Sequence, residues 1–249
     1  MVDLVDESIK KVWEEWDEWK PLPNQEAWEI FKNAKLRKWL NPVAFPESIY
    51  SEADKKYEEF MQQQKLFREF LKKHGERVDS WLLEEKSERK VGFRAQKWFS
   101  EMLFDLKVPH DSELKWQTLS ENFFKVDLDE LGLTLNEWKE IYYALSTGPD
   151  INIDNFGTVE VKSTNNIKKT AWDSNPSLFL VKVKACDKES LSFQFVGWLY
   201  GHEVYKLRFQ KKEFPLYPKS HYFLEDKELR NPQEFLEKLL EISRAKPEL

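Results

Sequence analysis

Residues 148–163 constrain the fold of this chain more than any other stretch, because a turn separates two alternating segments. Side chains two residues apart on a strand share a face, so each segment has one apolar face and one polar face. Between the segments, an Asp-Asn-Phe-Gly sequence supplies turn residues, and Gly157 tolerates a positive φ. The stretch predicts a β-hairpin whose core-facing positions are Ile151, Ile153, Val159 and Val161.

The polar face of this hairpin brings together Asp150 from the first strand with Glu160 and Lys162 from the second. Two carboxylates suit a hard cation such as Mg²⁺, which prefers oxygen ligands. An amine beside that ion holds or polarises a water molecule, or stabilises charge on a phosphate. The plainer alternative is an ordinary surface hairpin with a Glu–Lys ion pair.

The arrangement resembles the PD-(D/E)xK nuclease superfamily, through Pro149-Asp150 and then Glu160-Val161-Lys162. The resemblance implies a restriction-endonuclease-like α/β (α+β) fold, in which helices flank a central mixed sheet. It also implies that Asp150, Glu160 and the Val161 carbonyl oxygen bind Mg²⁺, with Mn²⁺ as a substitute. In the same comparison, Lys162 positions or activates the attacking water.

Glu-x-Lys spacing alone is weak evidence in a chain that is 34% charged. Only the pair at 160 and 162 follows an Asp-led strand and a glycine turn. The same spacing recurs in segments that look helical or highly charged, at Glu18/Lys20, Glu84/Lys86, Glu88/Lys90, Glu113/Lys115, Glu137/Lys139 and Glu225/Lys227.

A helix is predicted over 91–104, because Ala95, Trp98, Phe99, Met102 and Leu103 recur at helical spacing. The superfamily often has Gly, three residues and then Glu in this helix, where the acid completes the metal site. Counting from Gly92, this chain has Gln96 there. Glu101 lies roughly 140° away around the helix, so only one of the two side chains can face the site. The spacing favours Gln96 as the fourth site residue, and Glu101 is kept as a possible third acid.

Further strands are predicted downstream, at 177–184, 191–198 and 203–209, as continuations of the same sheet. The resemblance therefore covers roughly residues 90–240. We divide the chain into a helical N-terminal domain, 1–88, and a nuclease-like domain, 89–249.

The N-terminal domain is predicted to contain helices at 5–20, 25–40, 46–73 and 78–90. The chain has eleven Trp, and those in these helices are read as core residues. The functional options for this domain are a cap, a homodimer surface or a DNA-recognition subdomain. In the second domain, a capping box opens a helix at 134–145, and a terminal helix is predicted at 231–240.

Composition predicts a globular, intracellular (cytoplasmic) protein, with 41% hydrophobic residues and a single cysteine, Cys186, that suits a reducing compartment. No run of 18 apolar residues predicts a membrane span, and the acidic N-terminus lacks the apolar region of a secretory signal. Four scattered His and one Cys give no zinc-binding spacing.

The net charge of −6 argues against a protein that coats nucleic acid, but a nuclease needs only a local basic surface. Between Asn155 and His221, eleven Lys or Arg against six Asp or Glu give a net charge of +5. Solubilising charge on exposed strands is the simpler explanation for these residues. The candidate contacts to DNA phosphates are Lys168, Lys169, Lys206, Arg208, Lys211 and Lys212.

Together these patterns favour a Mg²⁺-dependent endonuclease that hydrolyses DNA phosphodiester bonds. The rival hypothesis is a non-catalytic module that keeps the nuclease-like fold and binds nucleic acid or protein, and Gln96 is the residue that favours it. A third hypothesis, a structural helical protein with an appended β domain, is based only on the Trp-rich N-terminus.

Overall fold

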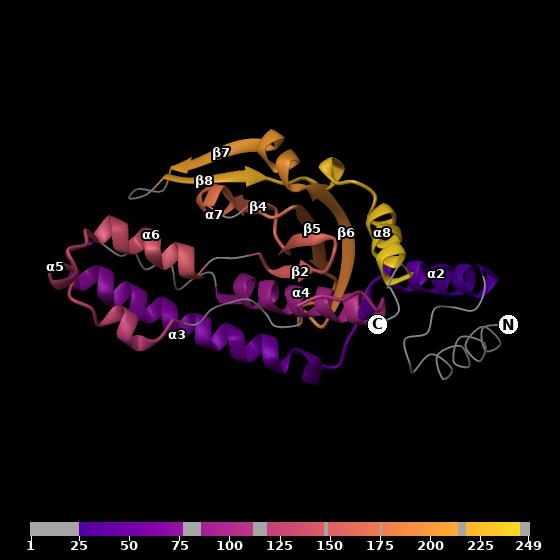
Figure 1. Ribbon diagram of the computed structural model, residues 1–249, viewed down its shortest axis with the longest axis horizontal. Coiled ribbons are helices and arrows are strands. Elements are labelled where there is room, and N and C mark those ends of the chain that lie inside the picture. The colour runs from indigo at the N-terminus through magenta and orange to yellow at the C-terminus, as the bar shows by residue number, and fades with distance from the viewer. Residues whose placement is uncertain are drawn as a thin grey trace.

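The computed structural model describes residues 25–76, 86–111, 119–146, 149–174, 176–213 and 218–244. Figure 1 shows a curled sheet with helices packed against it and a helical arm that extends to one side. The helix predicted at 5–20, and the first part of the one predicted at 78–90, lie outside the described residues.

Five strands form the central sheet, which combines parallel and antiparallel pairs. They are β1 (Val43–Ala44), β2 (Ile151–Ile153), β3 (Gly157–Lys162), β5 (Phe179–Ala185) and β6 (Ser192–Tyr200). Their order across the sheet is β1-β6-β5-β3-β2, with β3 and β5 parallel and the other neighbours antiparallel. The predicted hairpin is β2 and β3, and all four of its apolar positions are buried. The mixed α/β class is therefore confirmed.

One face of this sheet packs against α2 (Gln25–Trp39), α4 (Lys86–Asp105) and α8 (Pro232–Arg244) around the largest hydrophobic core. Burying a large apolar side chain contributes about 1.5–3 kcal/mol, so the apolar stripe of α4 fixes this helix on the sheet. The predicted stripe is fully buried, at Ala95, Trp98, Phe99, Met102 and Leu103.

The same core extends across the domain boundary expected at residue 88. Trp28 and Trp39 of α2 are buried in it together with the sheet residues. β1 also joins the sheet, because Val43 pairs with Phe193 of β6. The two-domain division stays a prediction, but the described N-terminal residues share one core with the sheet.

A second sheet covers the opposite face. Its strands are β4 (Asn166–Lys168), β7 (Arg208–Glu213) and β8 (Pro218–Phe223), in the order β4-β8-β7, and α7 (Lys169–Ser174) follows β4. Leu180 and Leu199 of the first sheet contribute to the core beneath it, which we call the inter-sheet core. Their neighbours Val181 and Trp198 belong to the core under α4. Consecutive strand residues face opposite sides, so the second sheet and α4 lie on opposite faces.

The prediction of a strand over 203–209 is wrong in two respects: its first half is not a strand, and its second half belongs to a different sheet. Gly201–Lys206 is a 3-10 helix, η4, and β7 begins at Arg208 in the second sheet. The Glu203 carboxylate accepts a hydrogen bond from Tyr200 N at 3.0 Å and pairs with Arg230 Nη2 at 2.6 Å. This local cap favours a turn, and the alternation of side chains does not reveal it.

The helical arm seen in Figure 1 has an aromatic core of its own. It contains α3 (Ser51–Lys73), η3 (Glu121–Phe124), α5 (Leu128–Leu131) and α6 (Leu135–Ser146). Ring centroids lie 3.9 Å apart for Phe70 and Trp138, and 4.2 Å apart for Phe67 and Tyr142. The predicted capping box is present at the start of α6, because Thr134 N donates to Glu137 Oε2 at 2.8 Å. Two short 3-10 helices complete the described elements, η1 (Glu47–Tyr50) before α3 and η5 (Asp226–Glu228) before α8.

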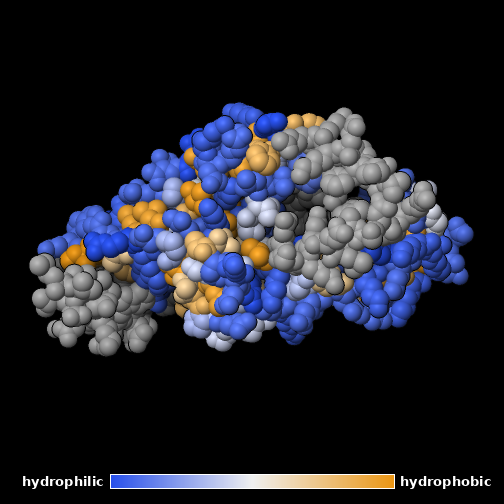
Figure 2. Space-filling view, turned by 180° about the vertical axis from the view of Figure 1, so that it is seen from behind, coloured by the Kyte–Doolittle hydropathy of each residue, from blue (hydrophilic) through white to orange (hydrophobic). Residues whose placement is uncertain are grey.

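The surface in Figure 2 is mostly hydrophilic, and small groups of hydrophobic residues interrupt it. Of the helices that the structure describes, none combines the length and the apolar character needed to cross a membrane. Large apolar side chains with at least half of their area exposed include Ile30, Phe104, Leu131 and Leu178.

Candidate functional site

The β2–β3 hairpin places Asp150 opposite Glu160. Ile151 pairs with Val159, and Asp150 and Glu160 are the next positions outward on the two strands. Gly157 has a φ of 121°, a conformation that side chains rarely adopt, so the tight turn depends on glycine at this position. The turn therefore sets the register that brings the two carboxylates together.

Two donors hold the carboxylate of Asp150 in place. Gln96 Nε2 on α4 donates to Oδ1 at 2.6 Å, and Val161 N on β3 donates to Oδ2 at 2.7 Å. The buried stripe of α4 fixes the position of Gln96, and β2 is the edge strand that this side chain reaches. A carboxylate oxygen has two lone pairs, so both hydrogen bonds are compatible with an additional cation.

Glu160 and Lys162 form an ion pair on the same strand, between Oε1 and Nζ. Their side chains are 18% and 26% exposed, so the pair is partly buried and still accessible from solvent. Glu160 is in register with Leu180, which lies in the inter-sheet core. The pair therefore lies on the sheet face that carries the second sheet, at its edge.

The electrostatics of the site favour a bound positive charge. Burial raises the pKa of Asp150 well above its usual range, and the nearby Glu160 carboxylate raises it further. Lys162 and the bonds from Val161 N and Gln96 act in the opposite direction. Burial alone lowers the pKa of Lys162, but Glu160 and Asp150 outweigh this effect and raise it. The ammonium group consequently stays charged and compensates part of the repulsion between the two acids.

Of the two polar candidates on α4, the structure brings Gln96 and not Glu101 into contact with Asp150. Glu101 Oε1 lies 3.0 Å from Lys97 Nζ, and Lys97 also pairs with Glu52 at 3.1 Å. Glu101 follows Gln96 by five residues, which on a helix directs the two side chains to different sides.

The six basic residues expected to contact phosphates lie outside the first sheet. Lys168 ends β4, Lys169 begins α7, Lys206 ends η4, and Arg208, Lys211 and Lys212 are in β7. The expectation that the +5 region shares the sheet of the candidate site is therefore wrong for these six residues, because β4 and β7 belong to the second sheet, whereas Lys162, Lys182 and Lys184 lie in the first. Lys169 forms an ion pair with Asp173, whereas the side chains of Lys206 and Arg208 are exposed.

Lys182 is a charged neighbour of the site that sequence reasoning missed. It is in register with Lys162 on the adjacent parallel strand, and it is 4% exposed. Its Nζ donates to Asn165 Oδ1 at 2.5 Å and pairs with the exposed Asp226. A lysine in an otherwise apolar strand (Phe-Leu-Val-Lys-Val) is the sequence signal that marks it.

The residues present fit a divalent metal ion such as Mg²⁺. Asp150 and Glu160 provide carboxylate oxygens, and the Gln96 amide and the Val161 backbone supply further oxygen atoms, the ligand type that Mg²⁺ prefers. Burial first, and the Glu160 carboxylate second, raise the pKa of Asp150, and a cation at this position would favour its ionised form. Within the described ranges, no cluster contains three or more His, Cys, Asp or Glu side chains in metal-binding proximity. The donor set therefore relies on two acids together with neutral oxygens.

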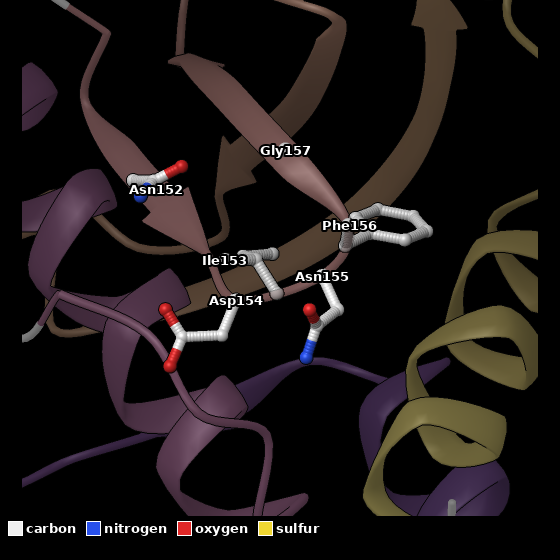
Figure 3. Close-up of a pocket in the computed structure, with 6 residues that line it drawn as sticks. All are labelled: Asn152, Ile153, Asp154, Asn155, Phe156 and Gly157. Atoms are coloured by element: carbon white, nitrogen blue, oxygen red, sulfur yellow. The ribbon is translucent and has the colours of Figure 1, made fainter.

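A hollow on the surface lies at the other end of the hairpin, lined by Asn152, Ile153, Asp154, Asn155, Phe156 and Gly157. Figure 3 shows Asp154 and Asn155 extending away from the strands at the turn. Strand residues rise about 3.3 Å each, so the nearest lining residue of the hollow, Asn152, is roughly 7 Å from Asp150 along the strand. None of the candidate site residues Asp150, Glu160, Lys162 and Gln96 lines it.

Comparison of the chain with models of protein families, with curated proteins and with solved structures finds no match in any of the three.

Proposed function

We propose that this protein is a metal-dependent nuclease that hydrolyses DNA phosphodiester bonds, as an endonuclease. The observation that carries the proposal is the convergence of Asp150, Glu160 and Lys162 on one hairpin, with Gln96 bonded to Asp150. Two neighbouring, partly buried acids lower the stability of a fold, so stability does not explain why they are placed together. Ionisable groups with shifted pKa values are concentrated at functional sites.

The proposed fold is restriction-endonuclease-like. A helix that precedes the hairpin and contacts its acid, a mixed sheet, and helices packed on one face of that sheet support this assignment. The parallel pairing of β3 and β5, with β4 and α7 in the connection between them, also agrees with a mixed α/β core of this type.

Asp150 and Glu160 are the residues that would hold Mg²⁺ or Mn²⁺, with the Val161 carbonyl oxygen as a further ligand. When bound, the cation supplies positive charge that polarises the phosphodiester and lowers the pKa of a coordinated water. Gln96 keeps the Asp150 carboxylate in a fixed orientation through its bond to Oδ1. Lys162 stays protonated, and its ammonium group orients the attacking water or stabilises charge that develops on the phosphate.

The test is to incubate the protein with linear, supercoiled, branched and single-stranded DNA, in Mg²⁺, in Mn²⁺ and in EDTA. We expect cleavage with either metal and none in EDTA. Glu160→Gln should abolish cleavage, whereas the matched control Glu101→Gln, which changes an acid of the Lys97 ion pair, should not. Cleavage that persists in Glu160→Gln at the level of the parent would refute the assignment.

A non-catalytic module with the same fold is the second candidate, and one observation favours it. Gln96 stands where a third acid is expected and donates to Asp150, so the site carries one negative charge fewer. Calorimetric titration with Mg²⁺ and Mn²⁺ distinguishes the candidates, because a module without catalysis has no need to bind either ion. DNA binding without metal binding or cleavage would establish the second candidate.

A further inference from the structure

A short exposed segment at the end of η4 and the start of β7 alternates anchoring and exposed residues. Val204 and Leu207 are buried in the inter-sheet core. The exposed residues beside them are two aromatic and two basic side chains, which we call the aromatic–basic segment: Tyr205, Lys206, Arg208 and Phe209. Tyr205 and Phe209 are 48% and 44% exposed, so each presents a large part of its ring to solvent.

The two exposed rings are held by a third. Tyr222 of β8 is 6% exposed and lies beneath both. Its ring centroid is 5.9 Å from that of Tyr205, at an interplanar angle of 85°, and 6.0 Å from that of Phe209, at 61°. Edge-to-face contacts of this kind stabilise aromatic pairs and restrict ring motion. The exposed rings therefore lose little conformational entropy when a flat ligand stacks on them.

The charge of the segment fits a polyanion. Lys206 and Arg208 are both exposed and lie next to the two rings in the chain. The nearby acids already have partners, because Asp173 pairs with Lys169 and Glu225 pairs with Lys227. Cations beside exposed rings match a chain of phosphates with bases that stack. Duplex DNA hides the faces of its bases, whereas unpaired bases offer them.

The anchors of the segment pack on the face of the first sheet that carries Glu160. Its anchors Val204 and Leu207 pack in the inter-sheet core with Leu180, and Leu180 is in register with Glu160. Neighbouring strands are about 4.8 Å apart, so the candidate acids and this core are close. A single DNA strand whose bases stack on the segment can therefore extend toward Asp150 and Glu160.

We propose that the aromatic–basic segment binds unpaired bases, and that the substrate of the nuclease is DNA with a single-stranded portion. The assignment of a substrate rests on the function proposed above, whereas the binding of single strands does not. Tyr205 and Phe209 stack on bases, and Lys206 contacts a phosphate between them. Arg208 faces the other side of β7 from Phe209 and adds positive charge to the segment.

The test measures binding by fluorescence anisotropy in EDTA, so that no cleavage interferes. Labelled single-stranded, duplex and flap oligonucleotides of matched sequence are titrated with the parent and with Tyr205→Leu, Phe209→Leu and the double variant. Loss of one base stack should weaken single-strand binding by roughly 5-fold or more. Duplex binding should change much less. Phe104→Leu is the matched control, because Phe104 is 69% exposed but lies on α4, across the sheet.

Leucine keeps the apolar contact with Tyr222, and a thermal melt of each variant checks that it is folded. Unchanged single-strand affinity in the folded double variant overturns the proposal, as does an equal loss for single strands and duplex. The same DNAs are then offered with Mg²⁺. If no DNA is cut but the double variant loses single-strand binding, the nuclease function fails and the binding inference stands. If duplex is cut and the double variant binds and cuts as the parent does, the inference fails and the nuclease function stands.

Discussion

Replacing Gln96 by Glu tests how the candidate site manages its charge. In the parent, Gln96 Nε2 donates to Asp150 Oδ1 at 2.6 Å. The acid Asp150 is already strained electrostatically, because burial and Glu160 raise its pKa. Gln96→Glu replaces the amide donor with a carboxyl oxygen and leaves the shape of the side chain almost unchanged. Without a cation, two carboxylates then meet where a donor and an acceptor met before.

The cost follows from two effects. A hydrogen bond to a charged group contributes about 1.5–3 kcal/mol, and this bond is lost when both acids are ionised. Two like charges about 4 Å apart repel by roughly 4 kcal/mol at an effective dielectric constant of about 20. Uptake of a proton by the new pair limits the total. We expect the free energy of unfolding to fall by about 2 kcal/mol, which for a chain of 249 residues lowers Tm by about 4–8 °C.

The assay is thermal and urea denaturation of Gln96→Glu, of the parent and of Gln96→Met, which removes the hydrogen bond without adding charge. Like charges raise the pKa of the new acid in the folded state. The folded protein therefore holds a proton more tightly than the unfolded chain, and the loss of stability appears as pH rises and disappears near pH 4. Mg²⁺ should restore Tm in Gln96→Glu, because ligand binding to the folded state stabilises it.

Equal stability of Gln96→Glu and the parent at pH 8 in EDTA would refute the reasoning. It would mean that position 96 does not face a carboxylate in solution. A loss of stability that Gln96→Met reproduces in full, without pH dependence, would assign the effect to packing and not to charge.

Three further outcomes follow from the described geometry. Asp150→Asn should unfold at the same or a higher urea concentration than the parent at neutral pH, because the raised pKa of Asp150 makes its ionised form unfavourable in the folded state. The difference should vanish as pH falls toward 4, where Asp150 of the parent is protonated. Lys162→Ala should reduce the single-turnover cleavage rate by about 10²-fold or more with DNA affinity little changed, and an equal loss of both would make Lys162 a simple phosphate contact. Gly201→Ala should destabilise the fold severely, because an added Cβ would lie 1.9 Å from Ser177 O, whereas the control Gly92→Ala, with nothing within 4 Å, should raise Tm slightly in its helix.

The parts of the site that sequence predicts are those set by local periodicity. The period of two along β2 and β3 places Asp150 and Glu160 on one face, and the structure brings these residues together. The period of α4 likewise separates Gln96 from Glu101, and only Gln96 contacts Asp150. Both arguments need only neighbours a few residues apart, which is why they work without knowledge of the fold.

Features set by distant contacts were not predictable in the same way. Lys182 meets Asp226 because two segments pair across the inter-sheet region, and nothing local to either residue indicates this. The segment from Glu203 looks like a strand, but besides capping η4 locally the Glu203 carboxylate pairs with Arg230, a distant residue in the sequence. Where the local preference for helix or strand is weak, long-range contacts therefore determine the structure that forms. They also explain why β7 joins a second sheet.

The pairing of β1 with β6 has a consequence for how the chain is made. Val43 leaves the ribosome long before Phe193, its partner in the sheet. Until β6 has been synthesised, the tryptophans of α2 have no sheet to pack against, and their exposed apolar surface can bind chaperones. A fragment that starts at residue 89 would lack β1 and leave the edge of β6 unpaired, a template for aggregation. Soluble expression should therefore require the residues before 89, and co-expression of a separate 1–88 fragment should rescue the truncated chain.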